Sequence, residues 1–275
     1  MLRIGRIAYA NCTPVFHRLL SRIDGEEYLF SEGVPSYLNA QLLAGEIDIC
    51  PSSSIEYARN PGRYLILPGL SISSDGPVGS VLLFSRLPLE QLGGQTVLLS
   101  SESATSVNLL RILLNKCFGC SCIFEVTDLP LAEGLKKAAA MLLIGDAALR
   151  SSLAAPDCNV YDLGQHWKEW TGLPFVFALW FCKREVAERQ HDEVVRLARH
   201  LLASKVHTEE TYRHLARVAP EASWMSEGRL VDYWMHNISY DLDQPHIEGL
   251  TLFFRLCVEL GLLADEPELH FLNFS

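Results

Sequence analysis

The sequence predicts a two-lobed α/β protein with mainly parallel sheets flanked by helices and a helical C-terminal part. Short apolar β runs alternate with helical stretches through residues 1–182, a pattern typical of parallel sheets covered on both faces. From Arg184 onward, apolar residues recur only at helical spacing. With 275 residues, of which 49% are hydrophobic, the chain is long enough for two lobes that each bury a core.

Residues 1–88 are expected to build most of the first lobe. Pro14 is tolerated in the first turn of one helix, Ser36 is expected to cap the next, and Gly45 ends it. A turn signal at residues 60–62 ends a third helix. The expected helices cover residues 11–20, 37–44 and 53–59. The expected strands cover residues 3–9, 47–50, 65–67 and 78–85.

A second series of βα units begins at Gln95, after a crossover over residues 88–94. Its expected strands cover residues 96–100, 122–126 and 141–144. Its expected helices cover residues 105–116 and 131–139, with a further helix from Asp146. The apolar strand over residues 175–182 is expected to return to the first lobe, and the helices after it are expected to pack there.

The expected layout is a discontinuous lobe of residues 1–88 and 183–275, with residues 89–182 as an inserted lobe. Two crossings near residues 85–88 and 181–184 would join the lobes, and such a connection acts as a hinge. The ligand cleft is expected between the two lobes.

Composition excludes several classes of protein. The formal charge is −10 and the basic residues are scattered, so nucleic acid is not an expected partner. No apolar run approaches the roughly 18 to 20 residues of a membrane span. Residues 3–9 predict a strand where a secretory signal would stand, so a cytoplasmic location is expected. The oligomeric state stays open between monomer and homodimer.

The eight cysteines are interpreted mostly as small buried hydrophobes in their reduced form. Cys117, Cys120 and Cys122 form a cluster that contains a Cys-x-x-Cys spacing. This cluster follows a helix and lacks further ligands at matching spacing, so neither a zinc nor a redox site is favoured. The nine His residues show no metal-binding spacing. No metal and no cofactor are expected.

Ligands in such folds bind at the carboxyl ends of parallel strands, where the next helix offers free N–H groups. Four polar loops are expected at such ends, over residues 9–14, 50–56, 100–106 and 144–148. In the first loop, Asn11 either positions a ligand hydroxyl or carboxylate or caps a helix. In the second, Ser53 caps a helix, touches ligand, or does both. Ser80 opens a strand that is expected to reach the hinge.

The third and fourth loops also enter helices. Ser103, Thr105 and Ser106 place hydroxyls at a helix N-terminus, which suits a carboxylate, although the segment lacks a nucleotide phosphate loop pattern. Gly145 allows close approach of the backbone to a ligand. Asp146 is open to three interpretations, namely a cap, a ligand contact or a base.

Six separated segments of the chain together carry a resemblance. They cover residues 6–14, 45–49, 75–78, 105–107, 143–149 and 167–178, the last of which reads WKEWTGLPFVFA. In this order they resemble the chorismate dehydratase family of the futalosine route to menaquinone. The match runs in register from Arg6 to about Trp180 and is looser in the C-terminal helices. Ala10 and Thr13 depart from the larger apolar residues of that family.

The resemblance implies an α/β, type II periplasmic-binding-protein-like fold that serves as an enzyme, a hydro-lyase. Its substrate would be the small molecule chorismate, which loses water to give 3-[(1-carboxyvinyl)oxy]benzoate. Carried over by position, Asn11 and Ser80 are expected to be catalytic. The residues expected to bind substrate are Ser53, Ser103, Thr105, Ser106, Gly145 and Asp146.

A site so poor in strong bases is consistent with this elimination. The hydrogen on the ether-bearing ring carbon is vinylogous to the ring carboxylate, so its removal gives a delocalised anion that expels the neighbouring hydroxyl. The enzyme is expected mainly to hold the conformer, stabilise charge and exclude water. The substrate's own enolpyruvyl carboxylate is the expected base, with Asn11 and Ser80 orienting it or the departing hydroxyl. Asp146 is the rival base.

Three alternatives share this fold. A transporter's solute-binding protein would use the same helix-terminus pockets, but the expected lack of a secretory signal opposes it. The sibling enzyme of the pathway, a dihydroxynaphthoate synthase, has a histidine-bearing N-terminal motif where this chain has Tyr9-Ala10-Asn11. A transcriptional effector domain would follow a helix-turn-helix, which the sequence does not predict.

Overall fold

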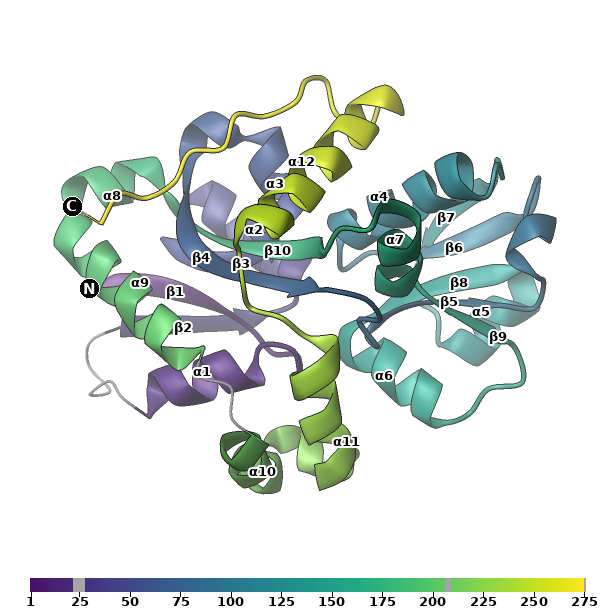
Figure 1. Cartoon of the computed structure of the whole chain (residues 1–275), viewed down its shortest axis with the longest axis horizontal. Coiled ribbons are helices and arrows are strands. Elements are labelled where there is room, and N and C mark those ends of the chain that lie inside the picture. The colour runs from purple at the N-terminus through teal and green to yellow at the C-terminus, as the bar shows by residue number, and fades with distance from the viewer. Residues whose placement is uncertain (22–27, 206–208, 275) are drawn as a thin grey trace.

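The computed structural model describes residues 1–21, 28–205 and 209–274, and it contains two five-stranded sheets that lie side by side (Figure 1). The first sheet has the strand order β2-β1-β3-β10-β4, formed by β2 (Tyr28–Gly33), β1 (Leu2–Ile7), β3 (Ile49–Ser53), β10 (Phe175–Lys183) and β4 (Tyr64–Ser74). The second has the order β7-β6-β8-β5-β9, formed by β7 (Ile123–Thr127), β6 (Thr96–Ser100), β8 (Ala140–Ile144), β5 (Val81–Ser85) and β9 (Asn159–Asp162). The two-lobed α/β fold is confirmed.

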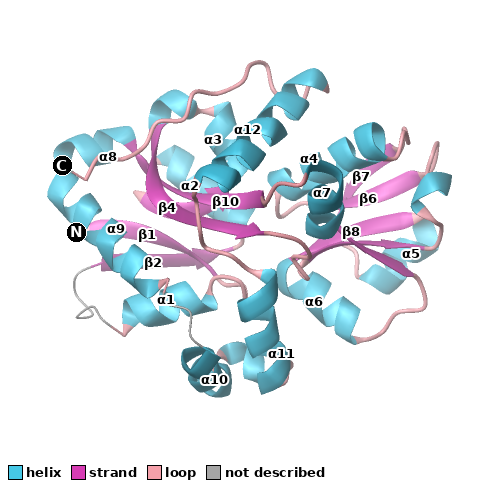
Figure 2. Cartoon of the chain, viewed as in Figure 1, coloured by secondary structure: helices cyan, strands magenta, loops and turns pink. Residues whose placement is uncertain are grey.

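Helices lie around both sheets (Figure 2). Those of the first 112 residues are α1 (Thr13–Leu20), α2 (Pro35–Ala44), α3 (Ser54–Arg59) and α4 (Ala104–Ile112). The next are α5 (Leu131–Lys137), α6 (Gly145–Leu153) and α7 (Leu163–Thr171). The last are α8 (Arg184–Arg189), α9 (His191–Ser204), α10 (Glu209–Val218), α11 (Glu227–Asp232) and α12 (Gln244–Glu259). Short π-helical turns follow α4 at Leu113–Cys117 and α11 at Tyr233–Asn237.

Both sheets are mixed, where mainly parallel sheets were expected. β1 runs parallel to β2 and β3, and β6 runs parallel to β7 and β8. β10 is antiparallel to β3 and β4, and β5 is antiparallel to β8 and β9. β5 and β10 are the first strands of their sheets after the chain passes between lobes. Both are almost wholly buried, and a uniformly apolar strand does not encode its direction.

The assignment of β5 and β10 to the two sheets differs from the expected lobe boundaries at residues 88 and 183. The chain leaves the first sheet after Ser74 and enters the second at Val81, so β5 lies in the inserted part. It returns through α7, and β10 lies between β3 and β4 in the first sheet. Burial on both faces identified these strands but could not assign their partners. Ser80 therefore lies in the segment that crosses between the sheets.

Several local expectations are corrected. Ser36 is not an N-cap, because Pro35 takes the first turn of α2 and Val34 the capping position. Gly45 ends this helix as expected, with φ of +78°. The first helix begins at Thr13 rather than residue 11. The strands β2 and β9 were not predicted, because their half-exposed sequences lack a strong apolar run.

The C-terminal helices pack mainly on the first lobe, as expected. α9 lies against α1 and β4, while α12 lies against β10 and also reaches α4 of the second lobe. Gly249 lets α12 approach closely, because a Cβ there would lie 2.1 Å from the carbonyl oxygen of Pro174. The C-terminal part is thus in contact with both lobes near the crossing strands.

Candidate active site

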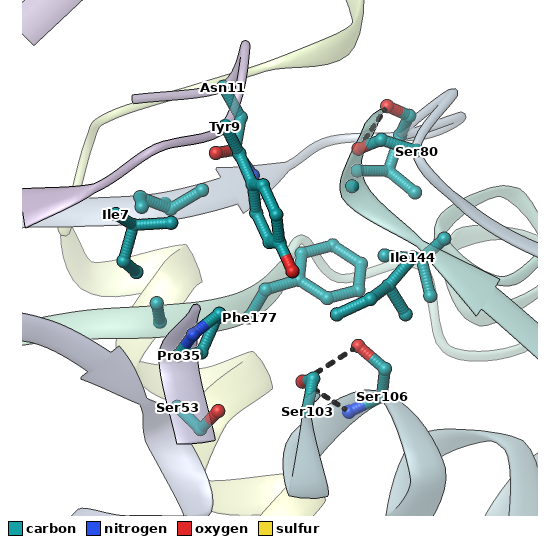
Figure 3. Close-up of a pocket in the computed structure, with 15 residues that line it drawn as sticks. Ile7, Tyr9, Asn11, Pro35, Ser53, Ser80, Ser103, Ser106, Ile144 and Phe177 are labelled. Carbon is teal, nitrogen blue, oxygen red and sulfur yellow. Dashed lines mark hydrogen bonds between the residues drawn. The ribbon is translucent and has the colours of Figure 1, made fainter. Parts of the chain in front are cut away.

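A cavity that encloses about 500 Å³ of empty space, partly open to solvent, lies where the two lobes meet (Figure 3). Its lining from the first lobe is Ile7, Tyr9, Asn11, Pro35, Ser53, Ile72, Phe177 and Ala178. The crossing segment and the second lobe add Val78, Ser80, Val81, Ser103, Ser106, Ile144 and Gly145. Six of the eight expected site residues are therefore brought to one cavity, and Thr105 and Asp146 are not among those that line it.

Asn11 lies in the turn between β1 and α1, and its side chain does not cap the helix. Cys12 takes the N-cap position of α1. The Asn11 Oδ1 atom is buried and has no hydrogen-bond partner among the described residues. Because an unpaired buried acceptor costs about 1 to 3 kcal/mol, buried polar groups are nearly always bonded. The amide is therefore the clearest unfilled hydrogen-bonding position in the cavity.

Ser80 lies at the end of the crossing segment and is buried. Its Oγ accepts a hydrogen bond of 2.8 Å from the Tyr233 hydroxyl and lies 3.4 Å from the Val78 carbonyl oxygen. The segment is fixed by Asp162, whose carboxylate accepts the backbone N–H groups of Val78 and Gly79 at 3.0 and 2.6 Å. Ser80 thus presents its hydroxyl from a rigid loop.

Ser103 and Ser106 lie at the N-terminus of α4 on the second-lobe side (Figure 3). Ser103 is the N-cap, and its Oγ accepts the Ser106 N–H at 3.3 Å and lies 3.1 Å from the Ser106 Oγ. Ser53 occupies the N-cap position of α3 without making a side-chain cap bond. Ser103 therefore caps α4 and also lines the cavity, whereas Ser53 lines the cavity without the cap bond that was one of its expected roles.

Thr105 and Asp146 tie the two lobes together instead of facing the cavity. The Thr105 Oγ1 accepts the Ile55 N–H at 3.1 Å and lies 3.2 Å from the Ser54 Oγ. The Asp146 carboxylate accepts the Ala10 N–H at 2.9 Å, and it makes no cap bond in α6. Burial raises the pKa of Asp146, an effect that the bond from Ala10 partly opposes. Sequence placed both near helix starts but could not show contacts that form between lobes.

The backbone at Gly145 leaves no room for a side chain. Its φ is +56°, and a Cβ on it would lie 2.9 Å from the Tyr9 ring. The Gly145 N–H donates to the Ser80 carbonyl oxygen at 2.7 Å, so it does not point freely at a ligand. The group packed closely against Gly145 is thus the Tyr9 ring, and an approach of this backbone to a ligand stays a prediction.

Tyr9 is a cavity residue that the sequence reasoning did not select. Its ring crosses the cavity between Asn11 and Ser80 on one side and Ser103 and Ser106 on the other (Figure 3). Its hydroxyl donates to Glu102 of the second lobe at 2.7 Å, and burial followed by this bond raises its pKa. Its place beside Asn11 was the available signal. The apolar lining, such as Phe177, belongs to buried strands and gave no separate signal.

The cavity has a particular electrostatic character. Among the described residues that line it, there is no Lys, Arg, Asp, Glu or His. Negative charge on a ligand would be met by hydroxyls, by the Asn11 amide and by the N-terminus of α4. The apolar lining keeps water away and strengthens such hydrogen bonds. This arrangement suits an anionic molecule with one large apolar face.

Two thiols of the cysteine cluster bond to backbone carbonyl groups. The Cys120 and Cys122 thiols donate to the carbonyl oxygens of Leu89 and Leu92 at 3.4 and 3.2 Å. Within the described residues, no three His, Cys, Asp or Glu side chains are grouped so that they could hold a metal ion. Over residues 1–21, 28–205 and 209–274, no helix has the length and apolar character to cross a membrane.

The chain is similar in sequence to a known protein family and to proteins of known name. The family described as menaquinone biosynthesis matches residues 2–259. A chorismate dehydratase from Thermus thermophilus is 33% identical over 269 residues, which cover 91% of this chain and 93% of the relative. The chain belongs to the menaquinone biosynthesis family. The resemblance carried by six sequence segments is confirmed.

The chain is also similar to a protein named for another activity. A 1,4-dihydroxy-6-naphtoate synthase from Thermus thermophilus is 26% identical and covers 97% of both chains. Among solved structures, the periplasmic aliphatic sulphonate binding protein SsuA from Escherichia coli matches with a TM-score of 0.65 at 16% identity. That match covers 97% of this chain and 89% of the other. It shows the fold alone, and the expected periplasmic-binding-protein-like fold is confirmed.

Proposed function

We propose that this menaquinone biosynthesis family protein is a cytoplasmic chorismate dehydratase, a hydro-lyase that converts chorismate to 3-[(1-carboxyvinyl)oxy]benzoate and water. The observation that carries the proposal is the unpaired Asn11 Oδ1 acceptor, on a residue that lines one apolar cavity together with Ser80. The relative with 33% identity bears the name of this activity. Asn11 and Ser80 are proposed as the catalytic residues.

The elimination breaks two bonds on neighbouring ring carbons. The proton on the ether-bearing carbon goes to a base, its electron pair becomes part of the new aromatic ring, and the adjacent C–O bond breaks. The departing hydroxyl takes a proton and leaves as water. Asn11 and Ser80, which both line the cavity, are proposed to orient the enolpyruvyl carboxylate or the departing hydroxyl. Such preorganised hydrogen bonds act most strongly where water is excluded.

Proton removal is assigned to the enolpyruvyl carboxylate of the substrate. The described lining of the cavity contains no carboxylate side chain. Burial raises the pKa of Asp146, but its carboxylate accepts the Ala10 N–H and does not line the cavity. A base carried by the substrate is held close to its proton by binding alone, which is a large advantage in effective concentration.

The ring carboxylate is assigned to the α4 side of the cavity. There Ser103 and Ser106 offer hydroxyls at the positive end of a nine-residue helix. Ser53 and Gly145 complete the proposed binding site, while Thr105 and Asp146 support it by joining the lobes. Chorismate carries two carboxylates, so this division gives one anionic group to each side of the cavity.

The test is incubation of the purified protein with chorismate, followed by mass spectrometry for the product that lacks one water. Conversion that scales with protein concentration supports the proposal. Chorismate that binds without conversion would indicate a solute-binding role. Neither binding nor conversion, followed by activity on the substrate of the naphthoate-forming relative, would place the chain with that enzyme instead.

A further inference from the structure

We infer that the C-terminal segment from Tyr233 to Tyr240 positions the polar groups of the cavity, and that Tyr233 is a positioning residue for Ser80. Three aromatic side chains of this segment donate hydrogen bonds to the cavity walls. Tyr233 donates to the Ser80 Oγ at 2.8 Å, Trp234 Nε1 to the Ala10 carbonyl at 2.8 Å, and Tyr240 to the Asn11 carbonyl at 2.7 Å. Only the kinetic part of this inference rests on the proposed function.

The direction of the bond at Ser80 decides what its hydroxyl can do. Tyr233 is buried, and that burial raises the pKa of its phenol, so the phenol stays protonated and acts as the donor. Ser80 Oγ accepts this hydrogen bond and keeps its own hydrogen for another partner. The Val78 carbonyl oxygen, to which the Ser80 hydroxyl can donate, lies 3.4 Å away, a long distance for a hydrogen bond between oxygens. The Ser80 proton is therefore available to a molecule in the cavity.

Tyr233 reaches Ser80 because of the local shape of the helix. It opens the π-helical turn Tyr233–Asn237, a distortion often found at functional sites. From the same turn, Asn237 Nδ2 donates to the Pro77 carbonyl at 2.8 Å. A Cβ on Gly79 would lie 3.4 to 3.5 Å from Asn237 and Tyr233 side-chain atoms. One turn of helix thus holds the crossing segment at Pro77 and at Ser80.

The rest of the segment is attached to the strand that leads into the crossing. Ser73 of β4 and Ser239 exchange backbone hydrogen bonds of 2.8 Å in both directions. Trp234 and Tyr240 then hold the carbonyl groups of Ala10 and Asn11 from outside the cavity. The turn that carries Asn11 and the loop that carries Ser80 are therefore fixed to one another through the C-terminal segment.

A hydroxyl that accepts a strong hydrogen bond becomes a better donor, because bonds in a chain polarise one another. Tyr233 would therefore make Ser80 a stronger donor toward the departing hydroxyl or a substrate carboxylate. This role predicts a change in the catalytic step rather than in binding alone. It also predicts that the effect of Tyr233 depends on Ser80.

The first test does not require substrate. Tyr233→Phe, Ser80→Ala and the double variant are compared by denaturant unfolding. Tyr233→Phe alone should lower the folded-to-unfolded ratio about fivefold, the scale of one lost hydrogen bond. In the Ser80→Ala background it should cause no loss, because the phenol there has already lost its partner. Tyr57→Phe is the matched control, since its buried phenol bonds Glu268 and His270 backbone outside the cavity. Its effect should be the same in both backgrounds.

The second test measures turnover of chorismate. Tyr233→Phe should lower kcat about 10-fold with KM changed less than about threefold, and it should add no loss to Ser80→Ala. Tyr57→Phe should leave kcat near that of the wild type. A kcat unaffected by Tyr233→Phe, or stability losses that simply add with Ser80→Ala, would overturn the inference. If the wild type does not convert chorismate, the proposed function fails and the unfolding experiment alone decides the role of Tyr233.

Discussion

On one side of the cavity, Ser103 and Ser106 bond to each other within a single turn of α4. On the other side, Ser80 and the turn that carries Asn11 are held by tyrosines 153 and 229 residues away along the chain. The first side is complete without a ligand, whereas the second leaves the Asn11 Oδ1 unpaired. A group that is rigidly held yet unsatisfied is prepared for a partner, so the Asn11 side is where the account places the chemistry.

The largest effect should come from Asn11→Ala. Loss of an orienting amide in a water-poor site should lower turnover about 100- to 1,000-fold. The free energy of unfolding should stay equal or rise, because the variant removes a buried acceptor that has no partner. Turnover and denaturant unfolding are measured together.

Asn39→Ala is the matched control for this variant. The Asn39 Oδ1 is also buried and unpaired among the described residues, but Asn39 lies in α2 and does not line the cavity. Its replacement should leave turnover near that of the wild type. Equal losses in the two variants would erase the contrast between the two sides of the cavity.

A smaller effect is expected on the α4 side. Replacing Ser103 and Ser106 together by Ala should weaken binding of the product by about 1 to 3 kcal/mol, the range for hydrogen bonds to a charged group. Stability should fall by about 1 kcal/mol through the lost cap. Calorimetric titration measures the affinity.

Asp243→Ala serves for comparison, since Asp243 caps α12 outside the cavity. It should reduce stability without changing the affinity for the product. An unchanged affinity in the double serine variant would move the carboxylate site away from α4.

The smallest effect concerns pH and the contact between the lobes. Because burial raises the pKa of Asp146 above its usual 3.8, the folded protein holds this proton to higher pH than the unfolded chain does. The free energy of unfolding should therefore fall as pH rises from 3.8 through the folded pKa. Asp146→Asn does not ionise, so over this window its stability should fall less than that of the wild type. Thermal unfolding across the range measures the difference, and parallel curves would contradict it.

Part of the fold could be predicted from the sequence, and part could not. Apolar runs identified β5 and β10 as strands, but their pairing partners depend on contacts made by chain far away. Ser36 was preferred as a cap for its side chain, while Pro35 was the stronger signal for the first turn of α2. Local chemistry predicts elements well because it acts within a few residues. Local chemistry does not determine the order of the strands in a sheet.

The same limit applies to the site. The sequence placed Ser103 at the start of a helix, and the structure adds that it caps this helix. The catalytic roles proposed for Ser80 and Asn11 came from the resemblance, since no periodicity marks these residues. Tyr233 and Tyr9 were not selected, because a buried tyrosine in a helix or turn has no local pattern that reveals its partner. Thr105 and Asp146 were expected to face ligand, but their partners are on the opposite lobe.

The most direct test of the central claim, that the cavity positions chorismate and the substrate supplies the base, is the turnover of Asp146→Asn. The variant keeps an oxygen that can accept the Ala10 N–H, so it should fold and bind chorismate. Its turnover should stay within about 10-fold of the wild type, because loss of a positioned general base would lower turnover about 10²- to 10⁴-fold. A variant that is folded and binds chorismate, yet has lost all turnover, would contradict the account and make Asp146 the base.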